Sequence, residues 1–178
     1  MAVAGRRQRA LLALLLLRAN DVVSVDALVE GLWGESPPKT AAHSLQVFVS
    51  DLRKALRAVG EDGRIVTQPP GYRIEVAPGE LDLQEAERLA AEGAFRDALA
   101  LWRGEPLADF AYEPFAQATV ARLEELRLTL LEGRIAADLA LGRHGELVGE
   151  LEELISQNPF REGLRAHLIL ALYRSGRQ

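Results

Sequence analysis

The sequence predicts a mostly α-helical protein, in which a winged helix-turn-helix of three helices and a C-terminal β-hairpin precedes an all-α, tetratricopeptide-like helical repeat domain. Three observations support this fold class: amphipathic periodicity over most of the chain, two strand-like segments after the third helix, and a 34-residue recurrence near the C-terminus. The 178 residues are 48% hydrophobic, which is too apolar for a disordered protein. We expect two domains, residues 1–79 and 80–178.

The first two helices are predicted from their apolar residues and their ends. The first runs from about Arg7 to Arg18 and contains the apolar run Ala10–Leu17. Eight residues are too few for a membrane helix, which needs about 20, so we expect a buried helix and no membrane partner. Ser24 is expected to cap the second helix, and Gly34 is expected to end it.

The third predicted helix, from about Thr40 to Val59, follows a proline-containing loop and has two different faces. The apolar face has the spacing of a packed helix and consists of Leu45, Val49, Leu52, Leu56 and Val59. The opposite face is polar and cationic, with Gln46 and Arg53 at its border, and consists of His43, Val47, Ser50, Lys54 and Arg57. Such a face suits major-groove reading and phosphate contact, although the helix alone leaves open a solvated outer face without a ligand.

The hairpin is predicted from two short segments joined by a turn. Ile65–Gln68 and Tyr72–Val76 have the composition of strands, and Pro69-Pro70-Gly71 separates them. In the second strand Tyr72, Ile74 and Val76 share one face. Tyr72 is therefore expected to anchor the hairpin in the core.

Charge is distributed unequally along the chain, although the net charge is −5. Residues 1–79 contain 10 Lys and Arg against 8 Asp and Glu, whereas residues 80–178 contain 11 against 18. Attraction to nucleic acid depends on local basic surface rather than on total charge. The first domain is thus the candidate for binding DNA, and the acidic second domain is not.

The second domain is predicted to be a succession of helices at about 82–92, 94–103, 114–141, 144–157 and 160–175. Gly142-Arg143 recurs 34 residues later as Gly176-Arg177, which is the tetratricopeptide period. The chain has no cysteine, its histidines lack metal-ligand spacing, and no catalytic triad or phosphate-binding glycine loop is visible. We therefore expect no cofactor, no metal and no enzymatic activity.

Five segments, taken in order, closely resemble the Streptomyces antibiotic regulatory protein family: Gln8–Leu15, Val23–Val29, Leu32–Gly34, Leu45–Arg53 and Pro69–Arg73. The resemblance implies an OmpR-type winged-helix DNA-binding domain followed by a bacterial transcriptional activator domain. It further implies a nucleoid-associated activator from an actinobacterium. The lack of a signal-peptide pattern makes a cytoplasmic location the expectation. The partners of such an activator would be double-stranded DNA, bound at direct repeats in promoters, and the RNA polymerase holoenzyme. Direct repeats allow a head-to-tail homodimer on DNA.

The sequence departs from this family at four places. Only Met1–Gly5 precede the first helix, so the usual N-terminal sheet is expected to be missing. The end at Gln178 predicts a C-terminally truncated activator domain with a final exposed apolar surface. Asp51 and Gln68 stand where relatives often carry arginine. An aspartate near phosphates is repulsive, which predicts weaker affinity or a different sequence preference.

The predicted DNA contacts follow from this resemblance and from the chemistry of each side chain. The helix starting at Thr40 would enter the major groove, where Gln46 can pair with adenine and Val47 can contact a thymine methyl group. His43 and Ser50 would reach base edges or phosphates, and Gln68 and Arg73 would lie at the minor groove or backbone. Arg53, Lys54 and Arg57 would hold phosphates. The competing hypothesis is a protein-interaction module in which the repeats bind a partner and the winged helix is a scaffold.

Overall fold

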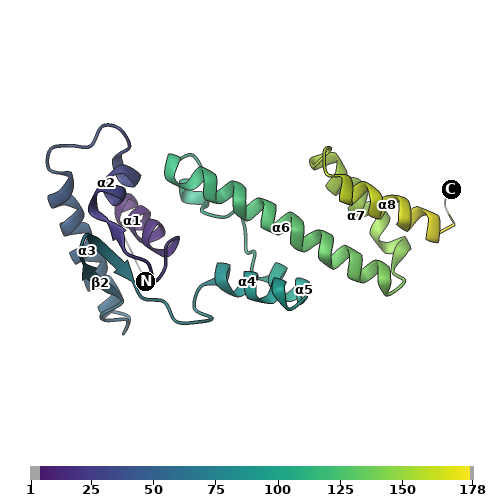
Figure 1. Cartoon of the computed structure of the whole chain (residues 1–178), viewed down its shortest axis with the longest axis horizontal. Helices are drawn as coiled ribbons and strands as arrows, with labels where there is room; N and C mark the ends of the chain where they lie inside the picture. The colour runs from purple at the N-terminus through teal and green to yellow at the C-terminus, as the bar shows by residue number, and fades with distance from the viewer. Residues whose placement is uncertain (1–4, 177–178) are drawn as a thin grey trace. The chain divides into compact units, whose positions relative to one another are not determined.

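Residues 5–81 form three helices and a small sheet in the computed structural model, which describes residues 5–176 (Figure 1). The expected absence of an N-terminal sheet concerns residues before Gly5, which lie outside the described residues. The structure confirms the predicted order of three helices and a hairpin. The elements are α1 (Arg6–Leu16), β1 (Val23–Ser24), α2 (Val25–Trp33), α3 (Ala41–Arg57), β2 (Ile65–Gln68) and β3 (Gly71–Ile74).

The sheet has three antiparallel strands in the order β1-β3-β2. Strand β1, which the sequence did not predict, pairs Val23 with Tyr72 and Ser24 with Gly71. Ser24 also caps α2, because its hydroxyl oxygen accepts a hydrogen bond of 3.2 Å from the backbone N–H of Ala27. A Cβ on Gly71 would lie 1.9 Å from the carbonyl oxygen of Val23, so this close strand pair requires glycine.

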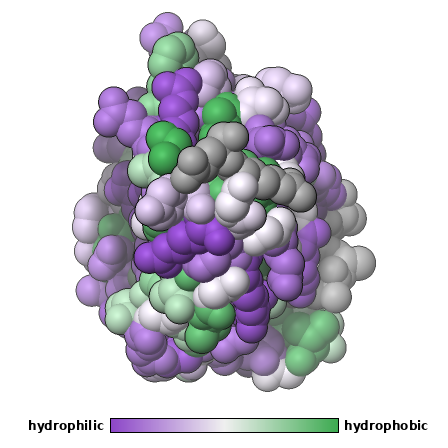
Figure 2. All heavy atoms as spheres, turned by 90° about the vertical axis from the view of Figure 1, so that its right-hand side faces the viewer, coloured by the Kyte–Doolittle hydropathy of each residue, from purple (hydrophilic) through white to green (hydrophobic). Residues whose placement is uncertain are grey.

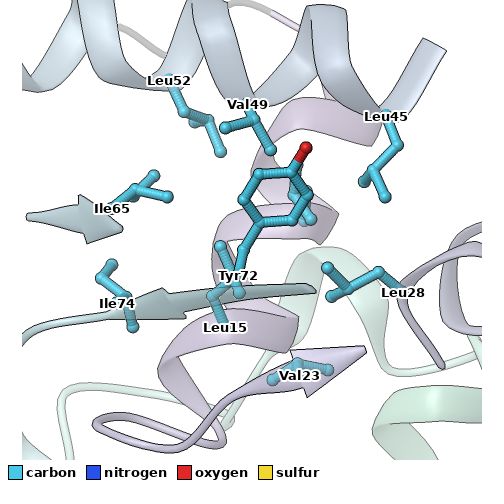
Figure 3. Close-up of a cluster of buried hydrophobic side chains, with 10 residues drawn as sticks. Leu15, Val23, Leu28, Leu45, Val49, Leu52, Ile65, Tyr72 and Ile74 are labelled. Atoms are coloured by element: carbon cyan, nitrogen blue, oxygen red, sulfur yellow. The ribbon is translucent and has the colours of Figure 1, made fainter. Parts of the chain in front are cut away.

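One hydrophobic core holds the three helices against the sheet (Figure 3). Figure 3 shows the ring of Tyr72 pointing from β3 toward Leu45 and Val49 of α3, which confirms its anchoring role. The prediction for Val59 was wrong: the residue follows the end of α3, and it is 51% exposed. The buried members of this core are Leu11, Leu15, Val23, Leu28, Leu45, Val49, Leu52, Ile65, Tyr72 and Ile74.

The chain divides into two units, one of residues 1–81 with 104–122 and the other of residues 82–103 with 123–178. The predicted first domain ended at residue 79, whereas the first unit also contains the segment 104–122. This segment contains a short 3-10 helix, η1 (Ala108–Phe110), and the beginning of α6 (Pro114–Ala140). Phe110 and Ala116 are buried against Ala10 of α1.

Two ion pairs accompany this contact in the first unit. Nη2 of Arg6 lies 2.7 Å from Oε1 of Glu113, and Nε of Arg9 lies 3.2 Å from Oδ2 of Asp109. All four side chains are at least 39% exposed, so the pairs add little to stability. The buried apolar side chains are the main source of stability in this contact.

The second unit is all-helical, as predicted. It contains α4 (Asp82–Ala91), α5 (Phe95–Ala100), the larger part of α6, α7 (His144–Gln157) and α8 (Glu162–Arg174). Gly142 and Gly176 follow α6 and α8 with φ of 84° and 70°, so the recurring glycine has the same left-handed backbone at both helix ends. Arg177 lies outside the described residues. The core of this unit contains Ile135, Leu139, Leu147, Val148, Leu151, Leu164 and Ala171.

The last helix has apolar side chains on its exposed side as well as in the core. Ile169 is 69% exposed and Tyr173 is 67% exposed. The face in Figure 2 is mainly hydrophilic, with separate hydrophobic patches. Within residues 5–176, no helix combines the length and apolar character needed to cross a membrane.

Candidate nucleic-acid interface

Helix α3 presents one side to the core and the other to solvent. Its core side is fixed by Leu45, Val49 and Leu52, each at most 2% exposed. On the opposite side the apolar residue Val47 is 44% exposed. The side chains that share this exposed side are His43, Gln46, Val47, Ser50, Lys54 and Arg57. A rigid helix therefore presents donors, acceptors, an apolar group and cations together, as major-groove recognition requires.

Two predicted phosphate-binding cations lie at the C-terminal end of α3 and form only exposed ion pairs. Nζ of Lys54 lies 3.4 Å from Oδ1 of Asp51, and Nε of Arg57 lies 3.2 Å from Oδ1 of Asp62. The side chains of Lys54 and Arg57 are 71% and 68% exposed. Pairs of this kind contribute about 0–1 kcal/mol each, so phosphate can replace the carboxylates at small cost.

The third predicted cation, Arg53, is held differently. Its Nε donates to the carbonyl oxygen of Ile65 at 2.9 Å, and its Nη2 donates to the hydroxyl oxygen of Thr67 at 2.8 Å. Both acceptors belong to β2. Arg53 thus connects the helix to the hairpin, a contact that the sequence analysis did not predict.

Asp51 is fixed beside the exposed face rather than directed freely into it. Its Oδ2 accepts a hydrogen bond of 3.0 Å from Nε2 of Gln8 in α1, while Oδ1 faces Lys54. Oε1 of Gln8 accepts in turn from the backbone N–H of Gly5 at 3.2 Å. The negative charge is therefore partly neutralised, but it remains next to the proposed DNA-binding surface.

The hairpin places its two predicted contact residues on different parts of the sheet. Gln68 is exposed at the end of β2, next to the turn, where it pairs with Gly71. Arg73 lies on the face of β3 opposite Tyr72, and its Nη2 donates to Oε1 of Glu75 at 2.5 Å. Arg73 also lines a groove with Asn20, Arg64 and Val76, and no residue of α3 is among the lining residues.

The loop that leads into α3 is exposed along its whole length, from Gly34 to Thr40. Thr40 is the N-cap residue of α3 but makes no capping hydrogen bond with its side chain. Trp33, at the end of α2, is half-buried: it stacks on Phe48 with ring centroids 6.1 Å apart, and the guanidinium of Arg7 lies 5.4 Å from its ring centre. These contacts hold the residue that precedes the loop, while the loop itself stays exposed.

Two family models match consecutive parts of the chain. The model of the transcriptional regulatory protein C-terminal domain matches residues 3–74, and the model of the bacterial transcriptional activator domain matches residues 74–178. The second match alone covers more than half of the chain.

Named relatives agree with these models. The chain is 42% identical to regulatory protein AfsR of Streptomyces coelicolor, with all of this chain and 19% of AfsR covered. It is 39% identical to regulatory protein DnrI of Streptomyces peucetius, with 97% of this chain and 71% of DnrI covered. The share of each relative that the chain spans therefore ranges widely, from about a fifth of AfsR to most of DnrI.

A solved structure has the same fold over nearly the whole chain. Mycobacterium tuberculosis EmbR, solved in complex with a low-affinity phosphopeptide, superposes with a TM-score of 0.89 at 34% identity, covering 99% of this chain and 51% of the EmbR chain. Both family models, in this order, and relatives that are named regulatory proteins show that the chain belongs to the Streptomyces antibiotic regulatory protein family.

Proposed function

We propose that the chain is a sequence-specific DNA-binding transcriptional activator, acting by binding rather than by catalysis. The observation that supports this most directly is the two-sided helix α3, with Leu45, Val49 and Leu52 buried and a polar, cationic side exposed. In this proposal α3 enters the major groove. Gln46 and Val47 read base edges, and His43 and Ser50 contact bases or phosphates.

The remaining predicted contacts set the position of the protein on the duplex. Thr40 is the N-cap residue just before the inserted helix. Lys54 and Arg57 hold phosphates, as does Arg53 through the part of its guanidinium that is not bonded to β2. Gln68 reaches the minor groove or backbone from the tip of the hairpin. Arg73 must first break its hydrogen bond to Glu75 before it can contact DNA. Of the predicted DNA contacts, it is the least favourably placed.

DNA binding is tested by selecting duplexes from a random pool with the purified chain, followed by gel shifts of the selected duplex. Four to six phosphate contacts predict that log affinity falls with log salt concentration at a slope of about −3.5 to −5.5. Lys54→Glu should weaken binding, whereas Arg127→Glu, the same charge change on an exposed residue of α6, should not. Failure to select any duplex, or an affinity independent of salt, would contradict the proposal.

We further propose that the chain binds direct repeats as a head-to-tail pair, in the cytoplasm at the nucleoid, and recruits RNA polymerase. The exposed loop from Gly34 to Thr40 is the candidate polymerase contact, because it lies next to α3 and carries polar side chains. Transcription in vitro with an actinobacterial polymerase tests this. Lys39→Ala with Glu35→Ala should lower transcript yield while the gel shift stays unchanged.

The alternative function is a protein-interaction module that uses the second unit. The exposed apolar residues Phe160, Ile169 and Tyr173, together with Asp51 beside the α3 face, favour this alternative. The two functions differ in one result. A pure interaction module would give no salt-dependent gel shift. Lys54→Glu would then leave partner binding by the second unit unchanged.

A further inference from the structure

Arg53 contacts β2 through two hydrogen bonds from one edge of its guanidinium group. Nε and Nη2 form this edge, and they donate to the carbonyl oxygen of Ile65 and the hydroxyl oxygen of Thr67 at 2.9 and 2.8 Å. A planar guanidinium presents these donors in a fixed fork, which restricts the angle between the two elements more than a single bond would. Lysine has the same charge but lacks the fork.

The two acceptors lie at opposite ends of the connection: one belongs to a buried residue of β2 and the other to an exposed residue. Ile65 is 3% exposed and packs in the same core as Leu52, the neighbour of Arg53, so the first part of the strand is already fixed by apolar packing. Thr67 is exposed and directly precedes Gln68 at the tip. The bond to Thr67 therefore extends the connection with α3 beyond the core, to the part of the hairpin nearest the proposed DNA contact.

We infer that Arg53 is a positioning residue that holds the hairpin tip at a fixed placement relative to α3, so that Gln68 and the α3 side chains reach one duplex in the same register. This inference rests on the proposed DNA binding. It separates Arg53 from Lys54 and Arg57, whose ion pairs are with the exposed carboxylates of Asp51 and Asp62. Those two cations are suited to phosphate contact by charge alone.

The first test replaces Arg53 with lysine, which keeps the charge and removes the fork. With the duplex selected by the unsubstituted protein as the probe, Arg53→Lys should weaken binding about tenfold, because binding must then order a hairpin tip that is no longer held against α3. The salt slope should stay the same, because the charge is kept. Arg127→Lys, the same substitution on an exposed residue of α6 outside the proposed interface, is the matched control and should change affinity less than about twofold. Equal affinities of the two lysine variants would overturn the inference.

The second test is a double-mutant cycle between Arg53→Lys and Gln68→Ala on the same duplex. If Arg53 positions the tip, the loss of affinity caused by Gln68→Ala should be at least about threefold smaller in the Arg53→Lys background than in the unsubstituted protein. Two independent DNA contacts would instead give additive effects, and additivity would overturn the inference. Thermal unfolding of each variant verifies that the fold is retained.

A third measurement needs no DNA. In the free protein, Arg53→Lys should speed amide hydrogen exchange in β2 and at the turn after it, and Arg57→Lys should not. If no duplex binds even the unsubstituted protein, the proposed function fails, and the exchange data still decide whether Arg53 fixes the hairpin. Unchanged exchange in Arg53→Lys would overturn the positioning role itself.

Discussion

The side-chain amide of Gln8 donates a hydrogen bond of 3.0 Å to Oδ2 of Asp51, and so joins α1 to the border of the exposed face of α3. This bond holds a carboxylate beside the surface that we propose for DNA. Lys54 faces the other carboxylate oxygen at 3.4 Å. Asp51 therefore joins α3 to α1, and its charge also reduces the positive potential at the proposed DNA-binding surface.

Asp51→Asn should increase affinity for the selected duplex. Asparagine keeps an oxygen that can accept from Gln8, while it removes one negative charge and releases Lys54. The loss of one repulsion near phosphate is expected to contribute about 0.5–1 kcal/mol, or about two- to fivefold in the dissociation constant. Gel shifts at low salt measure the effect. Glu152→Gln, the same charge change on an exposed residue of α7, serves as the control, and equal responses of the two variants would count against a local effect.

Gly71→Ala should destabilise the first unit, because its Cβ would lie 1.9 Å from the carbonyl oxygen of Val23 and separate β1 from β3. The expected loss in the free energy of unfolding is about 1–3 kcal/mol. Gly149→Ala in α7 is the matched control, since its Cβ meets no atom within 4 Å and alanine favours the helix. Urea unfolding of both variants measures the difference, and a Gly71→Ala protein as stable as the control would contradict the strand pairing.

The sequence could predict those elements whose signals are local. The bounds of β2 follow from a short β-branched segment between turns, and Ser24 and Gly34 define the ends of α2. Helical periodicity also predicted which α3 side chains are exposed. It failed at Val59, because the helix ends at Arg57 and the periodicity no longer applies beyond that point.

The features that could not be predicted depend on contacts between distant residues. A two-residue strand such as β1 has no periodicity, and it exists only because β3 lies beside it. The same holds within the candidate site. The bond from Gln8 to Asp51 joins residues 43 positions apart, and the bond from Arg53 to Thr67 joins residues 14 positions apart. No local pattern encodes these pairs, so Arg53 was predicted only as a phosphate contact.

Phe110→Ala should destabilise the first unit although the residue lies outside the predicted winged helix. Phe110 is 6% exposed and packs in the cluster with Ala10 and Ala116. Truncation of a buried phenylalanine costs about 3–5 kcal/mol in the free energy of unfolding. Tyr112→Ala is the control in the same segment, because Tyr112 is 94% exposed and its loss should change stability by less than about 0.5 kcal/mol. Similar melting temperatures for the two variants would show that segment 104–122 does not support the unit.

Asp138→Asn should destabilise the second unit in a pH-dependent manner. The carboxylate is 4% exposed, and it accepts hydrogen bonds from Arg96 at 2.5 Å, Arg134 at 3.3 Å and Arg143 at 3.2 Å. Burial alone would raise the pKa of Asp138, but the bonds from Arg96 and Arg134 outweigh burial and hold the pKa below its ordinary value of 3.8. Loss of the charge leaves three arginines without this partner. Because Arg96 and Arg143 are 61% and 46% exposed and can be hydrated, we expect a cost of about 1–3 kcal/mol.

The pH dependence follows from the lowered pKa of Asp138. The unfolded chain takes up the proton at a higher pH than the folded chain, so the contribution of the carboxylate is complete above the unfolded pKa and is lost as pH falls through the folded one. The difference in unfolding free energy between the unsubstituted protein and Asp138→Asn should therefore be constant near neutral pH and shrink below about pH 4. Urea titrations at a series of pH values measure it. Glu92→Gln, which breaks an exposed pair with Arg88, is the control and should lower the free energy of unfolding by less than about 1 kcal/mol. An equally small loss for Asp138→Asn would argue against a stabilising network.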